Sequence, residues 1–183
     1  IGDIKYIRAD FGINFEFNPT SRIFDLKLGG GSLLDVGVYP LFLVLHVLGR
    51  PNNVKSFVHH SPTGSDDLMN ALLYYDSGCV ASILSSTNCK TPHTADIIGS
   101  KGSIHIPAAW WKSQSITLTK GEDVTTIDTA FAGNGFEFEI AEVQRCLKAG
   151  KTESDLLPLS FSLMMSEIAE QILKSNNVIY PIG

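Results

Sequence analysis

The sequence contains no uninterrupted apolar run of the roughly 20 residues that a bilayer-spanning helix requires. Its longest apolar segment, residues 36–48, is broken by Gly37, Pro40 and His46. Basic residues are also few, because 14 Lys and Arg stand against 19 Asp and Glu, and they form no stripe. These shortages argue against a membrane partner and against a nucleic-acid partner. We therefore expect a soluble protein.

Cysteines and targeting signals are scarce as well. Cys79, Cys89 and Cys146 are odd in number and lack the close spacing of a zinc site or a redox pair, which is typical of reduced thiols in a cytoplasmic protein. The chain begins at Ile1 with neither an initiator methionine nor a signal pattern, so we interpret it as a piece of a longer protein. Its 183 residues, 44% of them hydrophobic, suffice for one domain with a core.

Apart from residues 32–48, most of the chain up to residue 128 has the pattern of β-strands. Segments rich in β-branched and aromatic residues are separated by tight turns such as Asp76-Ser77-Gly78, and strands joined by such turns run antiparallel. A sheet of predominantly antiparallel strands follows. The predicted strands are residues 4–17, 54–60, 67–75, 80–86, 95–98, 103–106, 115–119 and 124–128.

Three segments have helical periodicity. The first, residues 32–48, ends at Gly49 with Pro51 just beyond. The other two are residues 136–149 and 160–175, with apolar side chains three or four positions apart. Strands followed by helices predict an α+β fold, with a single open, predominantly antiparallel β-sheet and helices on one face.

A dinucleotide site of the common type is missing from the chain. Such a site needs a strand, a G-x-G-x-x-G turn and a helix, because the pyrophosphate requires close backbone approach at a helix N-terminus. Gly29-Gly30-Gly31 has neither this spacing nor the Lys of a phosphate loop. We interpret these glycines as a tight turn with close packing at a helix start.

The segment from Gly29 to Gly49, GGGSLLDVGVYPLFLVLHVLG, is the most specific feature of the sequence. It resembles the G-G-G-x-L-x-D-x-G-x-[HY] signature of the Gfo/Idh/MocA (glucose-fructose oxidoreductase / inositol dehydrogenase) family, and its Tyr variant is closest in motif to the dihydrodiol dehydrogenase branch. The segments YYDSGCVASILSSTN, DIIGSKGSIHIP and NGFEFEIAEVQRCLKAGKTESDLLPL resemble other parts of the family's pattern. The resemblance implies a glyceraldehyde-3-phosphate dehydrogenase-like C-terminal domain. Residues 1–183 would then be the substrate-binding and oligomerisation domain, and the N-terminal Rossmann domain would be absent from this chain.

Asp35 and Tyr39 are four residues apart and so share one helix face. The resemblance implies that Tyr39 is the catalytic proton donor or acceptor for the substrate and that Asp35 orients substrate or catalytic partners. A free phenol has a pKa of about 10, so proton exchange near neutral pH benefits from a nearby cation. The family supplies a Lys from an E-K-P motif in the half that binds NAD or NADP, which is not in this chain.

Structural roles for the same residues remain open at this point. Ser32-x-x-Asp35 imitates a capping box, so Asp35 could serve only the helix start. Tyr39 in an apolar helix could be a core residue with its hydroxyl bonded. Pro40 cannot make the regular helical bond, and we expect an irregularity near Gly37 that turns Tyr39 toward a cleft.

Four further residues are candidates for substrate binding. Arg22 lies on the loop before the glycines, where solvated charge is the alternative. His93 lies in the loop after Ser86-Thr87-Asn88, where the family often places substrate contacts. Trp110 and its neighbour Trp111, with Phe131 or Phe136, could form an aromatic wall; of two adjacent Trp, one is more often buried and one at an interface.

The full-length protein is predicted to be an NAD(P)-dependent dehydrogenase acting on the CH-OH group of a sugar, polyol or cyclic diol, and the present chain alone is predicted to be inactive. One alternative is a non-catalytic binding or dimerisation module, which a plugged pocket at Tyr39 would favour. Another is an NAD-dependent glycosidase of the same superfamily, which would cleave glycosides without net cofactor reduction. In the family the free sheet face pairs with another subunit, so we expect a homodimer that buries on the order of 2,000 Å².

Overall fold

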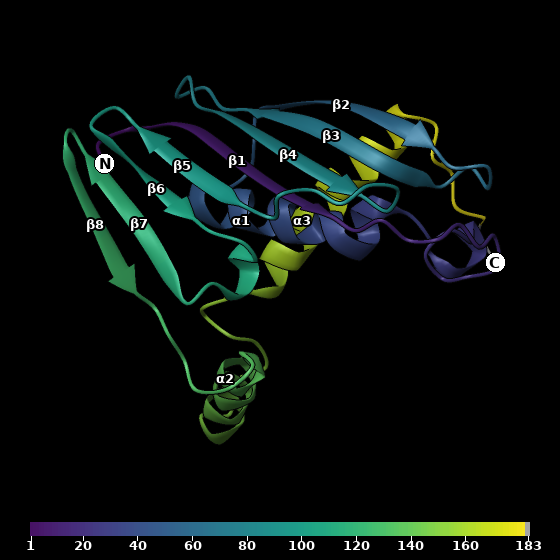
Figure 1. Ribbon diagram of the computed structural model, residues 1–183. Helices are drawn as coiled ribbons and strands as arrows, with labels where there is room; N and C mark the ends of the chain where they lie inside the picture. The colour runs from purple at the N-terminus through teal and green to yellow at the C-terminus, as the bar shows by residue number, and fades with distance from the viewer. Residues whose placement is uncertain (182–183) are drawn as a thin grey trace.

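A computed structural model describes residues 1–181 and contains one open sheet of eight strands (Figure 1). The strand order is β2-β3-β4-β1-β5-β6-β7-β8, in which β1 and β4 are parallel and every other neighbouring pair is antiparallel. The predicted α+β class and the predominantly antiparallel sheet are therefore confirmed. The strands are β1 Ile4–Gly12, β2 Asn53–His60, β3 Asp66–Tyr74, β4 Val80–Ser86, β5 Ala95–Gly99, β6 Gly102–Ile106, β7 Ser115–Lys120 and β8 Asp123–Asp128.

Helical segments connect β1 to β2, follow β8 and, as one short turn, connect β6 to β7. The crossover after β1 passes beneath the sheet, which lets β4 return parallel to β1. α1 and α3 pack together on one face of the sheet, as expected, whereas α2 lies apart from it below β7 and β8 (Figure 1). The segments are η1 Leu26–Leu28, the π-helical turn η2 Leu33–Gly37, α1 Val38–Leu48, η3 Trp110–Lys112, α2 Phe136–Lys148 and α3 Leu159–Ser175.

The core lies between the sheet and the α1–α3 layer. Ile7 of β1, Leu41 of α1 and Ile172 of α3 are fully buried there. The stretch Leu26–Leu48 is long and apolar enough, by length and composition, to cross a membrane. The core helix of a soluble protein passes the same test, and Leu33 and Leu41 on this stretch are 0% exposed within the protein core. We therefore treat it as a core element.

Two sequence expectations differ from the structure in an informative way. The strand expected to reach residue 17 ends at Gly12, because its partner β4 ends at Ser86, the residue that pairs with Gly12. Ile13 and Phe15 continue to donate hydrogen bonds, to the carbonyls of Ser86 and Thr87, but the ladder stops. The helix expected over residues 32–48 is also not uniform, since its first turn is π-helical.

Candidate functional site

The site is built on the junction between η2 and α1. Pro40 has no amide hydrogen for the carbonyl of Val36, and the helix changes from the π form to the α form at Val38. The irregularity expected near Gly37 therefore takes the form of a π-helical turn. Such turns are frequent at functional sites, since the wider turn changes the direction of the side chains on it.

Tyr39 is open to the surface instead of sealed in the core. Its side chain is 43% exposed, and its ring packs edge-on against Phe11 and Trp111, with centroids 5.2 and 6.1 Å away. Within residues 1–181 its hydroxyl has no hydrogen-bond partner. The interpretation of Tyr39 as a core residue is wrong.

A pocket of about 400 Å³ opens beside Tyr39. Its walls are almost entirely apolar and come from three separate parts of the chain: α1, η3 and α3. Because the pocket is open, the plugged site that would favour a non-catalytic module is not found. The lining residues are Val38, Tyr39, Phe42, Trp110, Trp111 and Met165.

Asp35 forms an ion pair with Arg22, one turn before Tyr39. Arg22 Nη1 donates to Asp35 Oδ1 at 2.5 Å, and the carboxylate raises the pKa of the guanidinium. Arg22 stays 71% exposed at the side chain, whereas Asp35 is only 18% exposed. Ser32 makes no side-chain cap to this turn, so the capping-box interpretation of Asp35 is wrong. The structure joins two candidates into one charged pair.

Phe11 is the centre of the aromatic wall. Trp111 stacks on it at 3.7 Å, and His93 meets it edge-on at 5.1 Å. His93 Nε2 lies 2.6 Å from the carbonyl oxygen of Gly12, so Nε2 carries the hydrogen and Nδ1 keeps a lone pair when the ring is neutral. Trp110 is 9% exposed and donates its indole N–H to the carbonyl of Asp10 at 2.9 Å. His93 and Trp110 thus belong to the wall.

Phe131 is not brought to this wall. It precedes α2, which lies apart from the sheet, and its ring packs on Phe138 with centroids 5.5 Å apart. The expectation that Phe131 completes the aromatic wall with Trp110 is therefore not met, because the chain after β8 leads away from the sheet to α2 (Figure 1).

Sequence reasoning missed three residues: Phe11 in the aromatic wall, and Phe42 and Met165 in the pocket lining. The alternation of β1 buries Ile7, Ala9 and Phe11 on one face, so that pattern could have placed Phe11 under the helix. Phe42, three residues after Tyr39, could have been found from helical spacing. Met165 lies on α3, and no local pattern indicates its approach to α1.

The glycine run does not fit the phosphates of a dinucleotide. Gly31 has φ +140°, and a Cβ there would lie 2.1 Å from Oδ1 of the buried Asp66. A Cβ at Gly30 would lie 2.7 Å from the amide nitrogen of Asp25. The space beside Gly30 and Gly31 is filled by backbone and by a carboxylate, which would repel a phosphate. Their role is close packing, as the sequence indicated.

The family follows from comparison with known proteins. The profile of the GFO/IDH/MocA C-terminal domain matches residues 1–105, which is more than half of the chain. The chain therefore belongs to the Gfo/Idh/MocA family of oxidoreductases, as its signature between Gly29 and Gly49 indicated.

Curated relatives and solved structures refine this assignment. The trans-1,2-dihydrobenzene-1,2-diol dehydrogenases of Xenopus tropicalis and Homo sapiens are 39% and 30% identical over 99% of the chain. The chain spans 57% and 56% of their lengths. An aldose-aldose oxidoreductase from Caulobacter crescentus, complexed with glycerol, shares the fold with a TM-score of 0.83 at 20% identity, over 96% of this chain and 54% of that chain. A 3-ketoreductase from Actinomadura kijaniata, in complex with NADP and TDP-benzene, gives 0.80 at 20% identity, over 96% and 55%.

Proposed function

We propose that the full-length protein is an NAD(P)-dependent dehydrogenase and that this chain supplies its substrate-binding domain. The observation that supports the proposal most is the exposed phenol of Tyr39, which has no hydrogen-bond partner among residues 1–181 and lies at the mouth of an apolar pocket, one turn from an ion pair. Tyr39 is the general acid or base, and Asp35, held by Arg22, is its polar neighbour. The bound dinucleotide supplies the hydride chemistry.

The chain's own task is proton transfer and positioning. In the oxidation direction Tyr39 Oη takes the proton of the substrate hydroxyl as the carbonyl forms, and in reduction it returns that proton. A phenol ionises near pH 10, so Tyr39 needs a neighbouring cation to act as a base at neutral pH. Arg22 does not provide this charge, because Asp35 neutralises it. We propose that the cation is the family's Lys, on a domain outside this chain, and that the chain alone is inactive.

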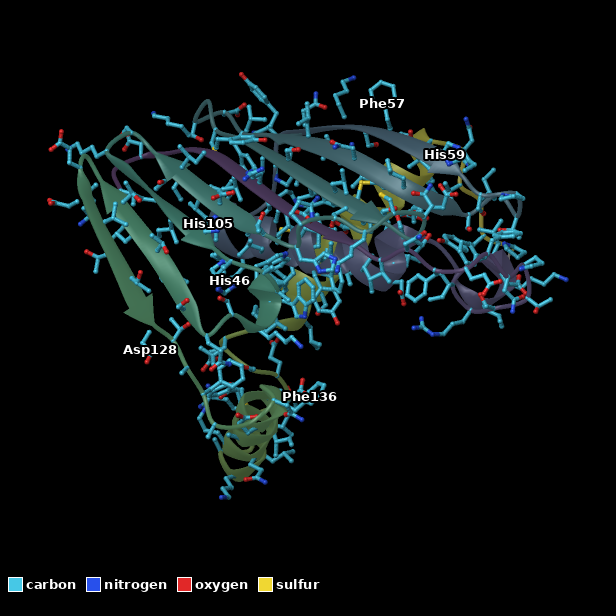
Figure 2. All side chains as sticks on the ribbon, viewed as in Figure 1. His46, Phe57, His59, His105, Asp128 and Phe136 are labelled. Atoms are coloured by element: carbon cyan, nitrogen blue, oxygen red, sulfur yellow. The ribbon has the colours of Figure 1, made fainter. Side chains whose placement is uncertain are left out.

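This chain also has an exposed apolar surface that the proposed nucleotide-binding domain can cover. One side of α2 carries four apolar side chains that are 55–70% exposed: Phe136, Ile140, Val143 and Leu147. Figure 2 shows Phe136 on this isolated helix. The relatives are longer than this chain by more than two fifths of their length, which leaves room for a domain that packs there.

The chain's three cysteines are free thiols, which suits the cytoplasmic location we propose.

We further propose a homodimer through the open face of the sheet. Phe57, Leu72, Tyr74 and Ile98 are 83%, 48%, 52% and 40% exposed on strands of this face. Figure 2 shows Phe57 and His59 projecting away from α1 and α3. An antiparallel sheet with one face packed on helices leaves the other for solvent or a partner, and an apolar patch favours a partner.

The lining of the pocket favours a cyclic diol with an apolar ring. A sugar exposes hydroxyls on nearly every carbon and needs polar partners for each, whereas this pocket offers aromatic and aliphatic walls beside one phenol. With NADP⁺, we expect the full-length protein to oxidise trans-1,2-dihydrobenzene-1,2-diol with a kcat/KM at least about tenfold above that for glucose or inositol. Initial rates of NADPH formation over this substrate panel measure the difference.

Two outcomes would contradict this substrate class. A preference for glucose or inositol would move the assignment to sugars. Release of an alcohol from a glycoside without net NADPH formation would instead identify the glycosidase alternative.

A further inference from the structure

Asp66, the first residue of β3, lies under the start of the site helix and is 0% exposed. Its Oδ2 accepts the amide hydrogen of Leu33 at 2.6 Å and the hydroxyl hydrogen of Ser32 at 2.8 Å. Ser32 Oγ also lies 2.9 Å from Ser85 Oγ on β4. The first turn of the helix is therefore seated on the sheet by buried polar contacts as well as by apolar packing.

Burial of the Asp66 carboxylate lowers the stability of the fold. Its Oδ1 is buried without a hydrogen-bond partner within residues 1–181, and it abuts the backbone of Gly31. Among those residues no basic side chain pairs with it. A buried carboxylate with an unsatisfied oxygen costs stability, and such costly groups cluster at functional sites.

We propose that Asp66 is a positioning residue whose carboxylate fixes the π-helical turn, and with it the directions of Asp35 and Tyr39. The proposal rests on the proposed catalytic role of Tyr39. A charged acceptor makes shorter and stronger hydrogen bonds than a neutral one and also favours the N-terminal end of a helix. At the other end of the turn, Gly37 lies so close to β4 that a Cβ would be 2.8 Å from Ser85 Oγ. The turn is thus held at both ends.

The charge of Asp66 gives this positioning a pH dependence. Burial, the largest cause, raises its pKa from 3.8 to about 6, although the bonds from Leu33 and Ser32 lower it. The titratable groups around it are Asp67, whose charge raises this pKa further, and Tyr180, whose phenol lies beside Gly31. Asp35, which is paired with Arg22, lies farther along the π-helical turn η2.

The sign of the stability effect follows from the raised pKa. Between pH 3.8 and about 6 the folded chain binds the proton more tightly than the unfolded chain, so the free energy of unfolding falls as the pH rises through this window. Above pH 6 the destabilising effect of the charge is fully present. Asn has the same shape without the charge, so Asp66→Asn stabilises the fold at pH 8 and leaves it unchanged below pH 4.

The test compares Asp66→Asn with the unsubstituted full-length protein. We expect a Tm higher by several degrees at pH 8, a kcat at least about tenfold lower, an unchanged KM for NADP⁺, and faster hydrogen exchange over residues 31–38. The unsubstituted enzyme should also lose kcat below about pH 6 on a limb that the variant lacks. Asp76→Asn removes a carboxylate from the distant β3–β4 turn and should leave kcat and its pH profile unchanged.

A lower Tm together with a proportional loss of activity would mean that Asp66 is merely structural, and an unchanged kcat would also overturn the inference. If the variant does not fold, Ser32→Ala tests the same contact, since it removes one of the two donors; a kcat within error of the unsubstituted value would reject the role. Tyr39→Phe is measured beside it. If Tyr39→Phe is fully active, both the proposed function and this inference are overturned. If Tyr39→Phe is inactive while Asp66→Asn is fully active, only this inference is overturned.

Discussion

Tyr39→Phe in the full-length protein is expected to lower kcat about 100- to 10,000-fold, the range that positioned acid or base groups contribute. The ring stays, so its packing on Phe11 and Trp111 and the walls of the pocket are kept. Only the hydroxyl is lost, and within residues 1–181 that hydroxyl makes no hydrogen bond. Tm and the KM for the diol should therefore change little. Steady-state kinetics with thermal unfolding measure both effects.

The matched control is Tyr75→Phe, which makes the same chemical change elsewhere. Tyr75 donates its hydroxyl hydrogen to the carbonyl of Gly49 at 3.1 Å. Loss of this bond should lower the free energy of unfolding by about 1 kcal/mol and leave kcat alone. A Tyr39→Phe enzyme within threefold of the unsubstituted rate would remove Tyr39 from the chemistry.

Phe57→Glu is expected to convert the full-length dimer into a monomer at micromolar concentration. Phe57 is 83% exposed on β2, on the sheet face that we propose as the interface. A two-fold interface brings each substitution in twice, so two buried carboxylates would weaken association about a thousandfold or more. Sedimentation velocity at several concentrations measures the change.

Ser77→Glu adds the same charge in the β3–β4 turn, away from that face, and should leave the dimer intact. A Phe57→Glu protein that still sediments as a dimer would place the interface elsewhere. A monomeric unsubstituted protein would reject the dimer altogether.

Local patterns were enough to predict most of the secondary structure. Apolar alternation, glycine turns and helical spacing gave seven of the eight strands, α2 and α3 to within two residues, and the first helix to within two residues when its π-helical turn η2 is counted with α1. They could not give the central position of β1, because its pairing with β4 joins residues more than 70 positions apart. The one large boundary error, at Gly12, has the same origin, since that strand ends where a distant partner ends.

The sequence could nominate residues for the candidate site but not their contacts. Spacing placed Asp35 and Tyr39 on one face, yet only the fold brings Arg22 to Asp35 and Trp111 to Phe11. The role proposed for Asp66 could not be predicted from the sequence, because an Asp at the start of a strand is usually part of a turn. Its role depends on burial beneath a helix 33 residues earlier in the chain.

The central claim is that this chain supplies the proton-transfer Tyr while the cofactor and the activating cation belong to another domain. The most direct measurement compares NADP⁺ reduction by residues 1–183 with that by the full-length protein, with trans-1,2-dihydrobenzene-1,2-diol as substrate. The account predicts turnover by the full-length protein and none by residues 1–183. Measurable NADPH formation by residues 1–183 alone would contradict it.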